Sequence, residues 1–136
     1  MSSAIQQLDP LERNKQLIIR WFEEVWNRGN RNAIAELFHE NAVLHDGVTD
    51  IRGPQEFHAF YDSLRAQFSE YQIKPVVVLA EDNLVCMHWS ADFRHKESGK
   101  SVHITGTSVV RVEGNQFVEG WQNWDAAGVQ AQLAAQ

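Results

Sequence analysis

The spacing of the apolar residues changes once along this chain, between residues 68 and 73, and that change constrains the fold more than any other feature. Before it, apolar residues recur three or four positions apart, as on one face of a helix. After it they alternate, as they do in Leu84–Arg94. Tight turns at residues 81–83, 98–100 and 114–115 divide this second part into strands joined as hairpins. Helices gathered ahead of an antiparallel meander predict the α+β class rather than α/β.

The first part of the chain contains the usual start and stop residues of helices. Asp9-Pro10-Leu11-Glu12 is typical of a capping box with proline in the first turn, and Gly29 is expected to end the helix that begins there. A short helix is predicted at residues 33–38 and a brief strand at residues 42–45. Gly53-Pro54 then begins a third helix, which has an unusually aromatic face.

Together these elements predict one domain over residues 1–136, in which a cone-shaped, curved antiparallel sheet wraps around the N-terminal helices and encloses a pocket. Residues 1–9 are expected to be a flexible N-terminus, and residues 125–136, rich in Ala and Gln, are expected to form a short final helix.

Charge and composition narrow the possible partners. A net charge of -6 argues against nucleic acid and anionic membrane, since both require a basic face. The N-terminus lacks the features of a signal peptide, and no stretch is long and apolar enough to span a membrane. The one cysteine, Cys86, has no partner for an intrachain disulfide. We therefore expect a cytoplasmic protein.

The chain contains 5 Trp and 7 Phe, more large aromatic residues than a filled cone of this size needs. Part of this set is therefore expected to line a cavity for a small hydrophobic or aromatic molecule, while Trp26 and Trp124 are expected to be structural. The residues predicted to bind the substrate are Trp21, Phe57, Tyr61, Trp89, Trp121 and Asn123.

Asp125 and His45 are the candidate proton-transfer residues. Strand alternation predicts that Trp121, Asn123 and Asp125 share the inner, aromatic face, where a desolvated carboxyl group suits proton transfer. The alternative is that Asp125 is only the N-cap of the final helix. His45, which shares a face with Val43, is either a hydrogen-bonded residue at the pocket rim or a second proton-transfer group.

Other kinds of site find no support in the sequence. The 6 histidines are scattered, without the spacing of a metal site. Gly106-Thr107-Ser108 lies in mid-strand rather than at a nucleophile elbow, and there is no Gly-rich phosphate loop. We therefore predict no metal and no nucleotide cofactor.

Several segments resemble one family. The chain ends with a Trp four residues ahead of an Asp, followed by a Gly and by Gln-Leu, and this ending is similar to that of the SnoaL-like polyketide or ester cyclases of the nuclear-transport-factor-2-like superfamily. The resemblance implies the cone-shaped fold, an acid/base role for Asp125, and no metal or organic cofactor. The segments that carry it are Glu23–Asn30, Leu37-Phe38, His45-Asp46, Gly53–Phe57 and Gly114–Leu133.

The outer face of the sheet is predicted to be fairly apolar, and a face of that kind usually meets another subunit. The resemblance also implies a homodimer formed through this face. The residues assigned to it are Val76, Val78, Cys86, His88, Ser90, Thr107 and Val109.

Three functions remain open from the sequence. One is a cofactor-independent cyclase- or isomerase-type enzyme that moves a proton next to a carbonyl group, with Asp125 as the acid/base. Another is a non-catalytic protein that only binds a hydrophobic ligand. The third is an assembly module that uses the face of its sheet, with the pocket closed by side chains.

Overall fold

The computed structural model describes residues 9–135, so the predicted flexible segment lies, apart from Asp9, outside the described residues. The helices are α2 (Pro10–Arg20), the π-helix η1 (Trp21–Asn27), α3 (Asn32–Leu37), α4 (Gly53–Gln67) and α5 (Ala126–Ala134). The strands are β1 (Phe38–Asp46), β2 (Thr49–Arg52), β3 (Phe68–Glu81), β4 (Leu84–His95), β5 (Ser101–Glu113) and β6 (Gln116–Trp124).

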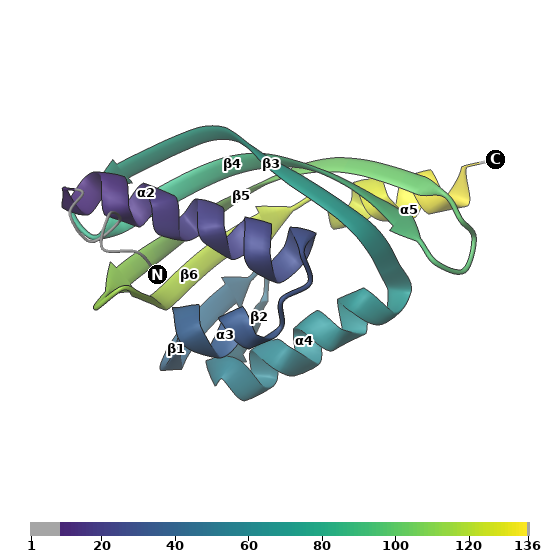
Figure 1. Ribbon diagram of the computed structural model, residues 1–136. Helices are drawn as coiled ribbons and strands as arrows, with labels where there is room; N and C mark the ends of the chain where they lie inside the picture. The colour runs from purple at the N-terminus through teal and green to yellow at the C-terminus, as the bar shows by residue number, and fades with distance from the viewer. Residues whose placement is uncertain (1–8, 136) are drawn as a thin grey trace.

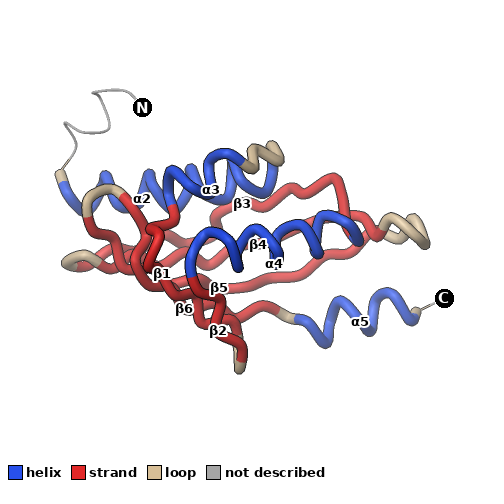
Figure 2. The backbone as a smooth tube through the Cα atoms, turned by 90° about the horizontal axis from the view of Figure 1, so that it is seen from below, coloured by secondary structure: helices blue, strands red, loops and turns tan. Residues whose placement is uncertain are grey.

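One curved six-stranded sheet, in the order β2-β1-β6-β5-β4-β3, forms the body of the molecule. The sheet curls over α2, η1 and α4, which pack against its concave face, while α5 extends beyond the end of β6 (Figures 1 and 2). The predicted α+β class and the order of the helices are therefore confirmed. The core lies between the helices and the concave face of the sheet.

The sheet is mixed, which corrects the expectation of an entirely antiparallel one. β1 runs parallel to β6, while every other neighbouring pair is antiparallel. β2 was not predicted, because it has four residues of which only Ile51 is buried, too few to show a period. It pairs with the end of β1 through a turn at Gly47-Val48.

The first helix begins as predicted but does not stay an α-helix. The Asp9 carboxylate accepts hydrogen bonds from the N–H groups of Leu11 and Glu12, which confirms the N-cap. From Trp21 the helix widens into η1. A π-helix of this length is rare and is often found at functional sites.

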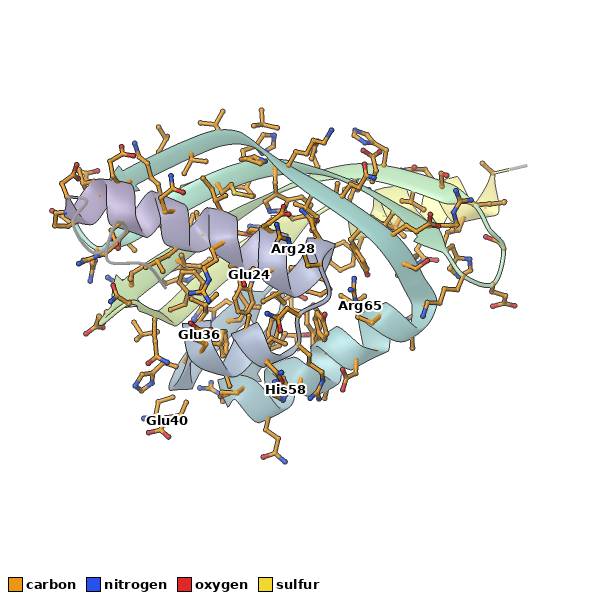
Figure 3. All side chains as sticks on the ribbon, viewed as in Figure 1. Glu24, Arg28, Glu36, Glu40, His58 and Arg65 are labelled. Carbon is orange, nitrogen blue, oxygen red and sulfur yellow. The ribbon has the colours of Figure 1, made fainter. Side chains whose placement is uncertain are left out.

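Hydrogen bonds to α4 and β3 hold the end of η1 in place. Tyr61 donates a hydrogen bond to the carbonyl of Val25 at 2.7 Å. Arg65 points from α4 toward η1 and donates to the carbonyl of Trp26 at 2.9 Å (Figure 3). The Asn27 amide pairs with both main-chain groups of Ile73 on the edge strand β3. The bonds from Tyr61 and Arg65 satisfy carbonyl groups that a helix end leaves unpaired, and the Asn27 bonds attach η1 to β3.

The outer face of the sheet differs from the prediction at one strand. Val78 pairs with the buried Met87 and packs against the core, whereas Val77 and Leu79 lie opposite His88 and Cys86 on the outer face. A β-bulge between Pro75 and Val77 shifts the register and causes this exchange.

Among residues 9–135, no helix is both long and apolar enough to span a membrane.

Candidate functional site

Two adjoining cavities lie between the helices and the concave face of the sheet. The larger, which we call the open cavity, has a volume of about 70 Å³ and is lined from η1, α4, β3–β6 and α5. The smaller, the deep cavity, has a volume of about 30 Å³ and lies toward α2, β1 and the start of β6. Phe22, Trp26 and Gln122 line both cavities, so the two cavities share part of their walls.

The open cavity is almost entirely apolar. Gln122 is the one residue with a polar amide in a lining that is otherwise aromatic or aliphatic. Trp26 and Trp124 both belong to this lining, although the sequence suggested structural roles for them. An apolar cavity with very few polar groups is the usual form of a small-molecule site.

Trp89 forms a wall of the open cavity because Gly106, its partner on β5, has no side chain. A Cβ atom at position 106 would lie 2.3 Å from Cζ2 of the Trp89 ring, far closer than any real contact. The indole N–H donates to the hydroxyl of Ser108 at 3.1 Å. Phe22 packs on the ring, with centroids 5.8 Å apart. The glycine therefore fixes the position of the wall.

A row of three polar side chains crosses the concave face. Asp46 of β1 pairs in register with Gln122 of β6, which pairs with Ser108 of β5. The Asp46 Oδ1 accepts hydrogen bonds from the Gln122 amide at 3.1 Å and from the Trp124 indole at 3.0 Å. Since both donors line the open cavity, Asp46 is separated from it by a single hydrogen bond.

The prediction that Trp121 and Asn123 face inward is wrong. Phe117 is buried on the concave face, and simple alternation from it would turn residues 119, 121 and 123 inward. A β-bulge intervenes, because Arg111 and Val112 pair with Glu119 and Phe117, which leaves one extra residue in β6. Residues after the bulge are therefore inverted, so that Gln122 and Trp124 face the cavity.

Asp125 follows the end of β6 and caps α5. Its side chain is exposed and accepts a hydrogen bond from the N–H of Gly128 at 2.8 Å. The expectation that it lies among tryptophans on the inner face is therefore not met in this structure. Its hydrogen bond to Gly128 agrees with the alternative that Asp125 is the N-cap of the final helix.

His45 faces away from the cavities, on the same side as Trp121, which also corrects the prediction. Ala42 and Leu44 are the buried residues of β1, so the neighbouring Val43 and His45 lie on the outer face. The His45 ring stacks on Trp121 and contacts Glu119 at 2.9 Å and Asp50 at 2.8 Å. The hydrogen bonds to Glu119 and then to Asp50 raise the pKa of His45, because both carboxylates favour the imidazolium form.

The remaining predicted residues divide between the two cavities and the core. Trp21 and Phe57 line the deep cavity, and Trp89 lines the open one. Tyr61 is buried against Trp26 and lines neither. Asp46, Gln122 and Ser108 are not among the residues predicted to form the site, because only the position of the bulge shows that they lie together.

Across residues 9–135, no three His, Cys, Asp or Glu side chains come together as a possible metal site. The site is an apolar chamber with a hydroxyl and an amide in its wall, and with a carboxylate one hydrogen bond behind that wall. Such a chamber can hold a flat hydrophobic molecule and present a proton-transfer group to one part of it.

The sequence and the fold were compared with those of known proteins. The sequence profile of the SnoaL-like domain matches residues 18–134. No curated protein matches the sequence significantly.

Solved structures show the same fold over nearly the whole chain. A proposed SnoaL-like polyketide cyclase from Jannaschia sp. CCS1 is 17% identical, has a TM-score of 0.85, and covers 96% of this chain and 97% of its own. A proposed polyketide cyclase from Acidithiobacillus ferrooxidans is 26% identical, with a TM-score of 0.79 and coverages of 88% and 93%. A protein with a ketosteroid isomerase-like fold from Catenulispora acidiphila, in complex with trimethylamine, is 14% identical, with a TM-score of 0.78 and coverages of 86% and 91%.

Because the profile matches well over half of the chain, and the helices and mixed sheet agree with these structures, the chain belongs to the SnoaL-like domain family of the nuclear-transport-factor-2-like superfamily.

Proposed function

We propose that this protein is a cofactor-independent enzyme of the cyclase or isomerase type, which moves a proton next to a carbonyl group in a small hydrophobic substrate. The observation that carries the proposal is the position of Asp46, whose carboxylate bonds to the two cavity-lining donors Gln122 and Trp124. General acid/base catalysis requires a side chain that can transfer a proton near the bound substrate, and a carboxylate beside an apolar chamber is such a group.

In this proposal Asp46 acts as the base. Its Oδ1 is held by two N–H groups, while its Oδ2 has no hydrogen-bond partner within residues 9–135. Asp46 itself lines neither cavity, so a substrate would have to reach past Gln122 and Trp124 for its acidic C–H group to meet Oδ2. Oδ2 would then remove the proton and return it to another atom of the same molecule. A positioned acid/base group contributes about 10²–10⁴ in rate. The aromatic walls would orient the substrate and exclude water.

Asp125 remains a second candidate for this role. The family resemblance implies it, and its distance along the chain from Trp121 matches the family ending. Its hydrogen bond to Gly128 and its exposure favour a capping role, so the two carboxylates must be separated by experiment. The bound trimethylamine of the Catenulispora protein supports a small-molecule site in this fold.

The general test is proton exchange at carbon, which requires no knowledge of the natural substrate. Hydrophobic ketones such as 2-tetralone are incubated with the protein in D₂O, and loss of the signals of the protons next to the carbonyl is followed by NMR. We expect the wild type to accelerate exchange and Asp46→Asn to reduce the acceleration about 100-fold. Asp50→Asn, on the outer face, is the matched control and should retain wild-type activity.

The outcomes separate the alternatives. Loss of exchange in Asp125→Asn but not in Asp46→Asn would assign catalysis to Asp125. Ligand binding without accelerated exchange in the wild type would favour the non-catalytic ligand-binding protein.

We further propose that two copies associate through the outer face of the sheet. Val77 and Leu79 on this face are 46% and 62% exposed, and they adjoin Cys86 and Val109 in neighbouring strands, which makes a continuous apolar patch. Light scattering during size-exclusion chromatography should give a dimer mass for the wild type and a monomer mass for Leu79→Lys. A monomeric wild type would contradict the proposal.

A further inference from the structure

The C-terminal helix α5 forms one side of the open cavity and is lightly attached to the rest of the fold. It continues from the end of β6, apart from the other helices (Figure 2). Val129 is its buried residue and lines the cavity, while Phe60 and Leu64 line the cavity from α4. Leu133 is half-buried against the core. A helix of 9 residues is marginal on its own in water, so the position of α5 depends on these few contacts.

Gln132 fastens α5 to the sheet. Its amide accepts a hydrogen bond from the N–H of His103 at 2.9 Å and donates one to the carbonyl of His103 at 2.8 Å. The pairing of β5 with β6 ends at Gly106 and Trp124. Gln132 therefore binds a part of β5 that β6 does not reach.

Lys100 fastens the other end of the helix. Its ammonium group donates to the carbonyl of Leu133 at 2.7 Å and to the carbonyl of Ala135. A cation at this end satisfies carbonyl groups that the helix leaves unpaired and is favoured by the helix dipole. The bonds of Gln132 and one of the two from Lys100 are exposed to solvent. Exposed hydrogen bonds and little buried apolar surface are typical of a segment that opens while the rest of the fold stays intact.

The connection between α5 and the sheet also contacts Asp46. Asp125 belongs to neither β6 nor α5, and Trp124 before it makes the last pair with β5. The Trp124 indole lines the open cavity and donates to Oδ1 of Asp46 at 3.0 Å. A movement of α5 about Trp124 and Asp125 would therefore take the indole ring out of the cavity wall and remove one donor from Asp46.

We propose that α5 is a lid, hinged at Trp124 and Asp125 and latched by Gln132 and Lys100, whose opening admits the substrate to the cavity and to Asp46. In the closed form Trp124 and Gln122 separate the cavity from Asp46, and opening removes the larger of the two. Closure then excludes water from the chamber. The part played by Asp46 rests on the proposed function, whereas access to the cavity does not.

Hydrogen exchange of the free protein, followed by NMR, tests the hinge without any ligand. If Trp124 moves with α5, its indole N–H and the backbone amides of α5 exchange through one opening. Gln132→Ala should accelerate all of them about 30-fold, because the two hydrogen bonds of the latch are lost. Gln130→Ala, the same change at an exposed position of α5, is the matched control and should exchange as the wild type does. The Trp89 indole N–H, which bonds within the sheet, should stay protected in every variant.

Binding kinetics test whether the opening admits a ligand. 2-Tetralone is mixed with the protein by stopped flow, and tryptophan fluorescence is followed because Trp26, Trp89 and Trp124 line the cavity. In Gln132→Ala the association and dissociation rate constants should both rise about 30-fold, with Kd changed by less than about twofold. Lys100→Met removes the ammonium group and keeps an unbranched side chain, so it should change both rates in the same direction and serves if Gln132→Ala does not fold.

The proposal is overturned if Gln132→Ala accelerates exchange in α5 but not at the Trp124 indole, since this would be fraying of the helix end alone. It is also overturned if α5 exchanges as in the wild type, or if 2-tetralone binds both latch variants at wild-type rates. Should no variant bind 2-tetralone, exchange at the Trp124 indole decides alone. Failure of the proposed function is distinct, because a lid that opens without proton exchange at carbon in D₂O would keep its hinge and lose the catalytic role of Asp46.

Discussion

Replacement of Gly106 by alanine should damage both stability and the cavity, because the new methyl group has no space. It would lie 2.3 Å and 2.4 Å from Cζ2 and Cη2 of Trp89, whereas carbon atoms in good contact are about 3.5–4.0 Å apart. Overpacking of this kind costs about 1–3 kcal/mol, and loss of the Trp89–Ser108 hydrogen bond costs about 1 kcal/mol more. Alanine is better than glycine in a strand by about 0.5–1 kcal/mol. The net expected loss is about 2 kcal/mol in the free energy of unfolding.

Urea unfolding measures this loss directly, and two further variants identify its cause. Gly120→Ala is the control: its methyl group would meet the movable end of Leu44 at 3.0 Å, so it should cost less than about 1 kcal/mol. In a Trp89→Leu background, Gly106→Ala should cost much less than it does alone, since the ring is gone. Our reasoning about this wall would be refuted if Gly106→Ala unfolded within about 0.5 kcal/mol of the wild type, or cost the same in both backgrounds.

Three further predictions concern contacts outside the cavity. Asn27→Ala should cost about 2 kcal/mol in unfolding free energy and speed hydrogen exchange of the Ile73 amide, because two hydrogen bonds to β3 are lost; unchanged exchange would contradict this. The raised pKa of His45 predicts stabilisation that is complete below pH 6.5 and is lost as pH rises through the folded-state value, so the stability deficit of His45→Gln should shrink in alkaline buffer. A deficit that grows with pH would reverse the sign. Asp125→Ala should cost about 1 kcal/mol through loss of the N-cap, whereas Asp125→Asn should remain near the wild type in thermal unfolding.

The helix boundaries could be predicted from sequence because the residues that set them are local. Asp9 caps α2, Gly53-Pro54 begins α4 and Asp125 caps α5, each through contacts within a few residues. The hairpins β3–β6 were likewise visible from alternation and turn residues. The π-helix could not be predicted, because its stability depends on Tyr61, Arg65 and β3, which are distant in sequence.

The site residues were harder to predict because an alternating pattern gives no information on which face is buried once a bulge intervenes. In β6 a tryptophan occurs at each parity, at 121 and at 124, so hydrophobicity favours neither face. The bulge depends on how β6 pairs with β5, which is a non-local interaction. Alternation counted from the buried Phe117 therefore assigns every residue of β6 after the bulge to the wrong face.

The bulge in β6 also determines which chemistry faces the ligand. On the concave side, Asp46, Gln122 and Ser108 lie in one row across β1, β6 and β5. On the outer side, one residue earlier or later in each strand, His45 and Trp121 lie in the corresponding row. A shift of one residue in β6 would put Trp121 or Asn123 in the place of Gln122. Trp121 would remove the amide between Asp46 and Ser108, and Asn123 would replace it with a shorter one. The polar row is thus a property of the strand order and of one extra residue, since its three members are separated by up to 76 positions in the sequence.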